Sequence, residues 1–298
     1  MEVIRAKIMG FCSGVRRAVS AAEKALSLNE KKEGTVWTLG PLIHNPMILE
    51  KLSERGLKIL DEKEARVSEK DTVIIRAHGV SPAVMRHLRH SAGNLIDATC
   101  PLVMQSQKRA SEYARRGYTI FFAGDEGHAE VVGIQGFVRE AIEKSKSKSA
   151  FFIVKSAAEF SLIFDSLEDF FERKFVLLSQ TTFSPVIFEE IRSLFKKKCP
   201  SAKVVCSICP ATNERQESLK SLCENVDGVL VIGGRASANT NRLFATAKEK
   251  CAFAALIENE TEIPKSFFSL KKVGVTAGAS TPDDVIDSVE NALKNGGL

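Results

Sequence analysis

Short apolar runs alternate along the chain with longer segments in which apolar residues recur every three or four positions. The runs Val3–Ile8, Tyr118–Ala123 and Gly228–Ile232 are typical of strands buried on both faces of a sheet. Residues 14–28 instead place valine, alanine and leucine on one face of a helix. Alternation of this kind predicts an α/β fold with mostly parallel sheets.

The same pattern predicts the remaining elements. Further strands are expected over residues 34–39, 71–75, 95–96, 151–154, 175–178, 203–205, 253–257 and 273–275. Helices are expected near residues 46–55, 101–116 and 210–223, and others begin near residues 82, 156 and 185. Two more are expected, one between Asn241 and the strand at 253–257 and one at the C-terminal end. Several of these begin with proline, whose missing N–H has no intrahelical partner at that position. The run Lys144–Ser149 alternates lysine and serine and is expected to be a solvated loop.

One cysteine follows a predicted strand in each third of the chain. Cys12 follows the first strand, Cys100 follows Leu95-Ile96, and Cys209 follows residues 203–205. The spacing between them is roughly that of one small α/β unit each. We therefore expect three similar lobes that meet at a shared centre: residues 14–100, residues 101–206, and residues 1–13 together with 207–298.

Composition narrows the class of protein. The chain has 298 residues, 44% of them hydrophobic, which is enough for a sizeable core. No apolar run approaches the ~20 residues that a membrane span needs, and no secretory leader is evident. The net charge of +5 is scattered, and two tyrosines and one tryptophan offer no aromatic ladder for bases. These features predict a cytoplasmic protein that binds neither nucleic acid nor membrane.

The seven cysteines divide into two groups by their surroundings. Disulfides are improbable in the cytosol. Cys199, Cys223 and Cys251 lie in or beside apolar patterns and are expected to be small buried hydrophobes. The three strand-end cysteines instead lie on turns rich in glycine, proline, serine or threonine.

Three such thiols suggest a metal centre with an open position. One possibility is zinc held by three cysteines and a histidine. Another is a cubane iron–sulfur cluster with one iron left for substrate. Cys206-x-x-Cys209 could form part of a zinc pair, but the sequence holds no second pair of that spacing.

The polar loops after the strands carry groups that bind anions. His44, His78 and His128 lie at strand ends beside or near glycine, where a histidine N–H can reach a ligand. Ser237, Asn239 and Ser280 lie near glycines at helix starts, which favour phosphate. Each of these three could equally be a helix cap. No Walker lysine or dinucleotide glycine motif accompanies them.

One acid stands out in these loops. Glu130 lies two residues after His128, where a carboxyl could carry protons or could simply complement a helix dipole. Thr181 could relay a proton to it or cap the helix that begins near Ser184-Pro185. Asp97 is a competing acid, although aspartate directly after a strand more often fixes a turn.

Together these motifs resemble one family, the 4-hydroxy-3-methylbut-2-enyl diphosphate reductases (LytB-type iron–sulfur reductases). The matching stretches occur in the family's order and span nearly the whole chain: Gly10–Val15, Gly40–Asn45, Arg76–Val80, Asp97–Pro101, Gly127–Val131, Gln180–Thr182, Ile208–Thr212 with Arg215-Gln216, and Gly274–Ser280. Several of these stretches are common in proteins when taken one at a time, but the whole set is highly specific to this family.

The resemblance implies a trefoil of three α/β lobes around a [4Fe–4S] cluster. It implies that Cys12, Cys100 and Cys209 ligate three irons and that the fourth takes the substrate's hydroxyl oxygen. It also implies that Thr181 contacts that hydroxyl and Glu130 delivers protons. The implied diphosphate ligands are His44, His78, His128, Ser237, Asn239 and Ser280. The products would be isopentenyl and dimethylallyl diphosphate, with electrons from a ferredoxin or flavodoxin.

The chain departs from the family pattern at two positions. The usual Ser-Ser-Asn reads Ser237-Ala238-Asn239, so one hydroxyl is missing while the backbone N–H of Ala238 stays available to the diphosphate. The usual His-Pro-Glu reads His128-Ala129-Glu130, which loosens the backbone but keeps both functional groups. The alternatives are a zinc-dependent phosphoester hydrolase and a non-catalytic, redox-sensing metal protein; iron and sulfide analysis separates them.

Overall fold

The computed structural model describes residues 1–30, 33–43, 45–61, 67–168 and 172–296. His44, one of the implied diphosphate ligands, lies outside the described residues.

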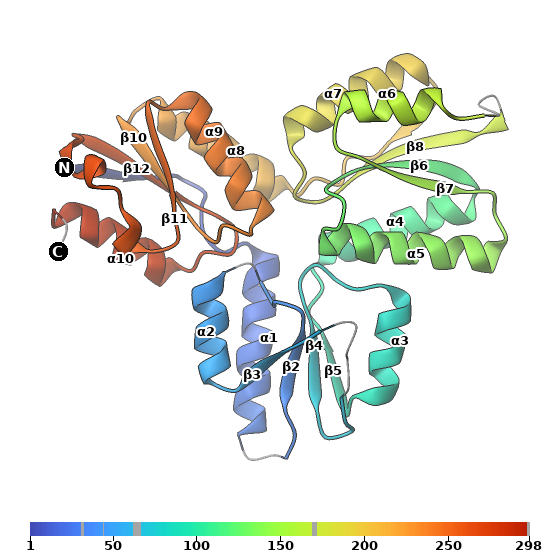
Figure 1. Ribbon diagram of the computed structural model, residues 1–298, viewed down its shortest axis with the longest axis horizontal. Helices are drawn as coiled ribbons and strands as arrows, with labels where there is room; N and C mark the ends of the chain where they lie inside the picture. The colour runs from blue at the N-terminus through green and yellow to red at the C-terminus, as the bar shows by residue number, and fades with distance from the viewer. Residues whose placement is uncertain (31–32, 44, 62–66, 169–171, 297–298) are drawn as a thin grey trace. The chain divides into compact units, whose positions relative to one another are not determined.

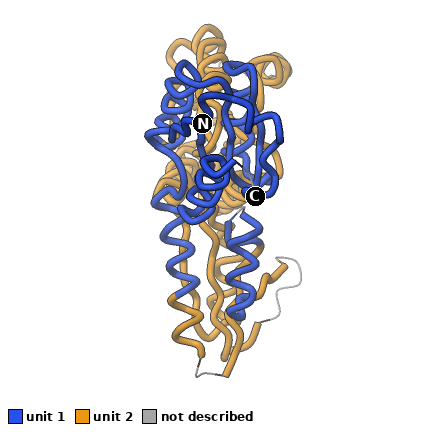
Figure 2. The backbone as a smooth tube through the Cα atoms, turned by 90° about the vertical axis from the view of Figure 1, so that its left-hand side faces the viewer, with its two compact units in different colours: residues 1–23, 41–57, 210–298 blue, residues 24–40, 58–209 orange. Residues whose placement is uncertain are grey.

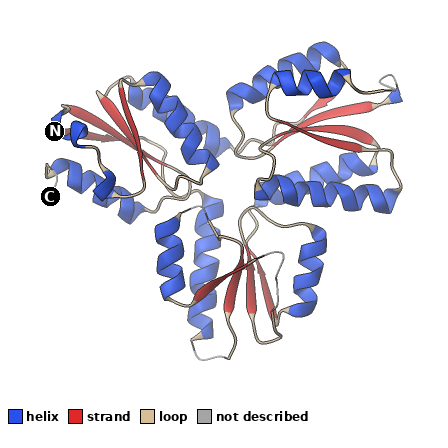
Figure 3. Ribbon diagram, in the orientation of Figure 1, coloured by secondary structure: helices blue, strands red, loops and turns tan. Residues whose placement is uncertain are grey.

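Over these ranges the strands form three four-stranded sheets (Figures 1 and 3). The first sheet has the order β3-β2-β4-β5 and contains β2 (Val36–Leu39), β3 (Leu57–Leu60), β4 (Thr72–Ile75) and β5 (Asn94–Asp97). The second has the order β7-β6-β8-β9 and contains β6 (Tyr118–Ala123), β7 (Ala150–Val154), β8 (Lys174–Ser179) and β9 (Lys203–Val204). The third has the order β1-β12-β10-β11 and contains β1 (Glu2–Arg5), β10 (Gly228–Ile232), β11 (Phe253–Ile257) and β12 (Lys272–Ala277). Apart from the β2–β3 pair, whose direction is not described, neighbouring strands pair in parallel, which confirms the predicted α/β class with three similar lobes.

Helices follow the strands in nearly the predicted places. They are α1 (Ser13–Asn29), α2 (Pro46–Glu54), α3 (Pro82–Ser91), α4 (Pro101–Arg115), α5 (Ala129–Ser145), α6 (Ala157–Asp165), α7 (Pro185–Lys198), α8 (Pro210–Cys223), α9 (Ala238–Lys250) and α10 (Asp283–Lys294), with short 3-10 turns at Glu260–Glu262 and Lys265–Ser269. Ser81 and Ser184 cap α3 and α7 through their hydroxyls, and proline follows each cap. These are the start signals that the sequence offered.

Three segments differ from the prediction. β1 ends at Arg5 rather than Ile8, because it pairs only with β12 and the backbone N–H of Ile8 donates to Ser218 instead. The short strand β3 was not predicted. The run Lys144–Ser149 is not simply a solvated loop: α5 continues to Ser145, and the hydroxyls of Ser147 and Ser149 donate to carbonyls at the α4–β6 junction.

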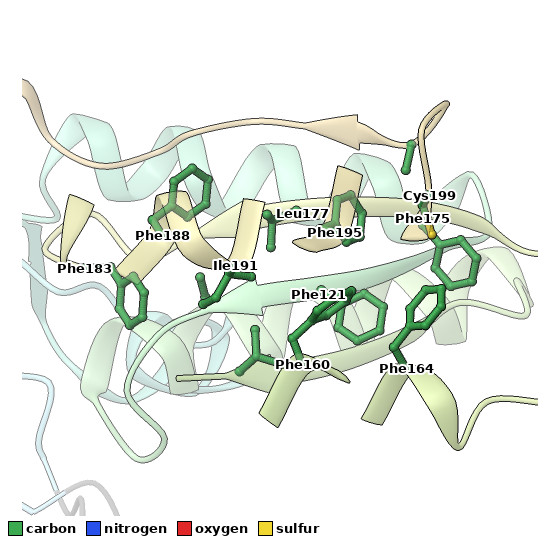
Figure 4. Packing of buried hydrophobic residues seen from close by; sticks show 13 residues of the cluster. Phe121, Phe160, Phe164, Phe175, Leu177, Phe183, Phe188, Ile191, Phe195 and Cys199 are labelled. Carbon is green, nitrogen blue, oxygen red and sulfur yellow. The ribbon is translucent and has the colours of Figure 1, made fainter. Parts of the chain in front are cut away.

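Helices bury both faces of the second and third sheets. Phe121 on β6 is fully buried and packs with phenylalanines of α6, α7 and β8 (Figure 4). The opposite face of that sheet packs against α4 and α5. In the third sheet α10 covers one face, while α8 and α9 cover the other. In the first sheet, β2 and β4 pack against Leu88 of α3.

The chain divides into two compact units (Figure 2). The first unit comprises residues 1–23, 41–57 and 210–298, and the second comprises residues 24–40 and 58–209. The strands of each sheet fall within one of the three predicted lobe ranges, whose boundaries stay a prediction. Among the described residues, no helix is long and apolar enough to cross a membrane.

Candidate functional site

The three strand-end cysteines all lie where a helix begins. Cys12 directly precedes α1, Cys100 precedes α4, and Cys209 precedes α8. Backbone N–H groups at a helix start carry partial positive charge, which complements a negatively charged group bound there. Cys12 belongs to the first unit, and the other two belong to the second.

The turn before Cys100 is held by Asp97. One carboxylate oxygen of Asp97 accepts hydrogen bonds from the backbone N–H of Thr99 at 3.0 Å and from its hydroxyl at 2.5 Å. The N–H of Cys100 then donates to the carbonyl of Ala77 at 3.0 Å, next to His78. Asp97 therefore has the turn-fixing role that the sequence favoured for it.

The loop of Cys12 is held from two sides within the first unit. The N–H of Cys12 donates to the carbonyl of Ala279 at 3.1 Å, and the buried Arg215 donates to the carbonyl of Gly10 at 2.8 Å. The N–H of Val15 lies 3.4 Å from the sulfur of Cys12 and donates to it. Hydrogen bonds of this kind to sulfur are among those that tune bound iron–sulfur clusters.

The donor set fits an iron–sulfur cluster. All three cysteines are free thiols, and each is half-buried at a helix start. Soft thiolate ligands suit zinc and iron–sulfur clusters rather than hard cations. Neither unit by itself, over the residues described, brings together three or more histidine, cysteine or acidic side chains that could hold a metal ion.

Of the three cysteines expected to be buried, only Cys199 is buried, while Cys223 and Cys251 are half-buried. Burial raises the pKa of the Cys199 thiol to about 11. Burial raises the pKa of the Cys223 thiol, and a hydrogen bond with the Cys251 thiol raises it further, to about 12. Both thiols therefore stay protonated and unreactive at neutral pH. Cys206 differs because it is exposed.

Two of the predicted histidines meet in the second unit. The rings of His78 and His128 contact edge to face, with their centroids 5.3 Å apart. His128 caps α5, because its Nδ1 accepts the N–H of Glu130 at 3.2 Å. In a neutral ring this bond leaves the proton on Nε2.

Glu130 is a buried carboxyl bound to Thr181. Glu130 is only 1% exposed, and one oxygen of its carboxyl group accepts the backbone N–H of Thr181 at 2.8 Å. The other oxygen accepts the Thr181 hydroxyl at 2.7 Å. The carbonyl of Thr181 in turn accepts the N–H of Cys209 at 2.7 Å. The acid is thus linked through one residue to a cysteine, while Ser184, not Thr181, caps α7.

The first unit holds the remaining polar residues. Ser237 caps α9 by accepting the N–H of Thr240 at 3.3 Å, which leaves its hydroxyl proton able to bond an anion. Ala238 is the first residue of that helix, where a backbone N–H lacks an intrahelical acceptor. Asn239 is 6% exposed, and its Nδ2 has no hydrogen-bond partner within the described part of the chain. The carbonyl of the buried Ser280 accepts Asn45 Nδ2 at 2.9 Å.

Three residues that hold these loops received no role from the sequence. They are Asn45, which joins the loop before α2 to Ser280, Arg215, which holds the Cys12 loop, and Gln180 beside Thr181. Each lies within a recognised motif, but its partner comes from a distant segment. Only the tertiary structure identifies those partners.

Comparisons with known proteins agree with this arrangement. A family model described as LytB protein matches residues 3–294. A relative from Treponema denticola named 4-hydroxy-3-methylbut-2-enyl diphosphate reductase is 42% identical, over 99% of this chain and all of the relative. A relative of the same name from Aquifex aeolicus is 35% identical, over 99% of this chain and 96% of the relative.

Solved structures give the same result. One is described as (E)-4-hydroxy-3-methyl-but-2-enyl diphosphate reductase, the terminal enzyme of the non-mevalonate pathway. It is 34% identical with a TM-score of 0.71, covering 99% of this chain and 100% of that one. The E-1-hydroxy-2-methyl-but-2-enyl-4-diphosphate reductase from Plasmodium falciparum is 26% identical with a TM-score of 0.86, covering 99% and 88%. The chain belongs to the LytB protein family.

Proposed function

We propose that the chain reduces 4-hydroxy-3-methylbut-2-enyl diphosphate to isopentenyl and dimethylallyl diphosphate, the last step of the non-mevalonate isoprenoid pathway. The observation that carries this proposal is the buried Glu130, whose two oxygens bind Thr181 beside Cys209. The relatives that bear the reductase name match the chain along nearly its full length, which supports the same activity.

We assign a [4Fe–4S] cluster to the protein, with Cys12, Cys100 and Cys209 as its ligands. The three sulfurs lie at helix starts, and one of them already accepts a backbone N–H. When bound, such a cluster supplies electrons one at a time. We expect those electrons to come from a ferredoxin- or flavodoxin-type partner in the cytoplasm.

In this proposal the diphosphate is held by hydrogen-bond donors. His78 and His128 supply ring N–H groups, and Asn239 supplies an amide N–H that has no partner among the described residues. Further donors are the hydroxyls of Ser237 and Ser280 and the backbone N–H of Ala238; His44 completes the proposed set. Such donors at helix starts stabilise a phosphate because the local dipole complements its charge.

Glu130 is the source of protons in this proposal. Removing the substrate hydroxyl consumes two electrons and two protons, breaks the C–O bond, forms one C–H bond and releases one water. Glu130 is itself buried, and an acid held in this way can deliver protons to a substrate inside the protein. The Thr181 hydroxyl, which contacts both Glu130 and the substrate hydroxyl in this scheme, orients that transfer.

The test is anaerobic purification followed by iron, sulfide and zinc analysis and by reduction of the diphosphate with an artificial one-electron donor. We expect iron and sulfide in the preparation, and both isoprenoid diphosphates as products. A preparation that contains zinc without iron, or an iron-loaded protein that leaves the substrate unchanged, would contradict the proposal.

A further inference from the structure

The side chain of Gln180 connects two loops of the proposed site. Gln180 is fully buried, and its Oε1 accepts the backbone N–H of Asp125 at 2.8 Å. Its Nε2 donates to the hydroxyl of Thr182 at 2.9 Å. Both hydrogen-bonding ends of the amide are therefore engaged. The proposed function gives this residue no task.

The two loops follow neighbouring strands. β6 and β8 pair in parallel in the second sheet (Figure 1), so the loops after their carboxyl ends lie side by side. The loop after β6 leads to His128 and Glu130, and the loop after β8 contains Thr181. A glycine at position 124 allows the close approach, because a Cβ there would lie 3.2 Å from Gln180 Oε1.

Hydrogen bonds connect these residues in a closed ring. From Gln180 the ring passes to the N–H of Asp125, whose carbonyl accepts the N–H of His128 at 3.1 Å. His128 Nδ1 accepts the N–H of Glu130, and the Glu130 carboxylate accepts both donors of Thr181. Thr181 is bonded covalently to Gln180, which closes the ring. The ring therefore couples the position of Gln180 to the orientations of His128 and Glu130.

We infer that Gln180 is a positioning residue, whose amide clamps the His128–Glu130 loop against the Thr181 loop and so orients the proton-delivering carboxyl. The inference rests on the proposed function. An amide suits the task because it donates and accepts without adding a second charge beside a buried carboxyl.

Two substitutions separate positioning from simple loss of structure. Gln180→Leu keeps the approximate volume but removes both hydrogen bonds. Gln180→Glu retains an acceptor for Asp125, and when protonated it also retains a donor for Thr182. We expect Gln180→Leu to lower kcat per loaded cluster by roughly 10- to 100-fold, because a small misplacement of reacting groups is costly.

The pH dependence gives the sharper readout. A buried carboxyl titrates above its ordinary range, so the activity of Gln180→Glu relative to wild type should rise as the pH falls from about 8 to about 6. The ratio for Gln180→Leu should stay low throughout. Gln105→Leu makes the same chemical change at an exposed position of α4 and should keep wild-type turnover.

A second measurement keeps the inference independent of activity. Hydrogen exchange at the amides of Asp125 and His128 should be faster in Gln180→Leu than in wild type. Wild-type kcat in Gln180→Leu, an equal loss in Gln105→Leu, a flat pH ratio in Gln180→Glu, or unchanged exchange would each overturn the clamp. If wild type itself fails to reduce the substrate, the proposed function fails, and amide exchange alone decides the role of Gln180.

Discussion

At the scale of single residues, the carboxyl of Glu130 is the group whose surroundings say most about chemistry. It is almost fully buried, and its two oxygens accept the backbone N–H and the hydroxyl of Thr181. A buried acid that is hydrogen-bonded to a residue next to a proposed cysteine ligand is well placed to deliver protons. A glutamate that merely complemented a helix dipole would need neither this burial nor Thr181.

Replacing Glu130 with glutamine should separate binding from turnover. Glutamine keeps the size and one acceptor oxygen but has no exchangeable carboxyl proton, so we expect turnover to fall by roughly 10²-fold or more. Iron content and substrate affinity should stay near wild type. Steady-state reduction with an artificial electron donor, alongside iron analysis and substrate binding, measures these quantities.

The matched control is Asp97→Asn. Asp97 fixes the turn before Cys100 through Thr99, so its substitution should reduce cluster content more than turnover per cluster. Near-normal turnover of Glu130→Gln would remove Glu130 from the mechanism. A large loss of turnover per cluster in Asp97→Asn would move the role there.

Asp71 gives a stability prediction at the same scale. Burial raises the pKa of its carboxyl, but hydrogen bonds from the backbone N–H groups of Ser68 and Thr35 outweigh burial and hold the pKa below the ordinary 3.8. A depressed pKa in the folded state stabilises the protein fully above the unfolded value, and this contribution is lost as the pH falls through the folded value.

The free energy of unfolding of wild type should therefore exceed that of Asp71→Asn by a constant amount above about pH 5. The excess should shrink as the pH falls below 3.8. Urea unfolding of both proteins across this range measures it. A difference that stays constant down to the lowest pH would show that the charge of Asp71 contributes nothing.

At the scale of elements, each lobe repeats the same unit: a buried strand, a short polar turn and a helix whose start points at the turn. Proline opens α4 and α8 directly after Cys100 and Cys209, so the thiols lie at the helix starts without a side-chain cap competing for that place. The strands and their packing hold these turns in place. The positions of the proposed functional residues therefore depend on the packing of hydrophobic cores that contain none of those residues.

Phe121 tests that dependence in the second lobe. Its ring contacts the rings of five other phenylalanines, and it is fully buried. We expect Phe121→Ala to lower the free energy of unfolding by about 3–5 kcal/mol, because truncation leaves a cavity in a close-packed core. Denaturant unfolding followed by circular dichroism measures the loss.

Phe253→Ala is the matched control, since Phe253 is 45% exposed at the start of β11. The same chemical change should cost about 1 kcal/mol there, because less apolar surface leaves the protein interior. If both variants lost the same free energy of unfolding, the buried phenylalanine cluster would contribute no more to stability than an exposed phenylalanine does.

At the scale of the whole molecule, the cysteines make the clearest prediction. We expect Cys12→Ser, Cys100→Ser and Cys209→Ser each to lower bound iron severely, because each removes one of the three proposed thiolate ligands. Substitution of Cys199, Cys206, Cys223 or Cys251 should leave the iron content near wild type. Iron and sulfide analysis after anaerobic purification decides between the two groups.

Cys206 provides the most demanding comparison, because it is exposed and lies three residues before Cys209. Loss of iron in Cys206→Ser together with retention in Cys209→Ser would reverse the assignment of the third ligand. The thiols of Cys199 and Cys223 have raised pKa values and stay protonated at neutral pH. We therefore do not expect either of them to replace one of the three proposed ligands.

The sequence by itself determined the fold class and most element positions, while the functional residues that the resemblance implies stay predictions. Local rules were sufficient there: apolar runs predicted buried strands such as β6, and Ser-Pro pairs predicted the starts of α3 and α7. The turn-fixing role of Asp97 could also be predicted, because its partner Thr99 is only two residues away.

Tertiary structure alone decided which distant groups meet. Glu130 and Thr181 are 51 positions apart in the sequence, and Asp125 and Gln180 are 55 apart, so no local signal predicts either contact. These pairs form because β6 and β8 are neighbours in the second sheet, which brings their following loops together. Strand order is a property of the packed sheet, so residues such as Gln180 and Asn45 gain their roles only when the chain is folded.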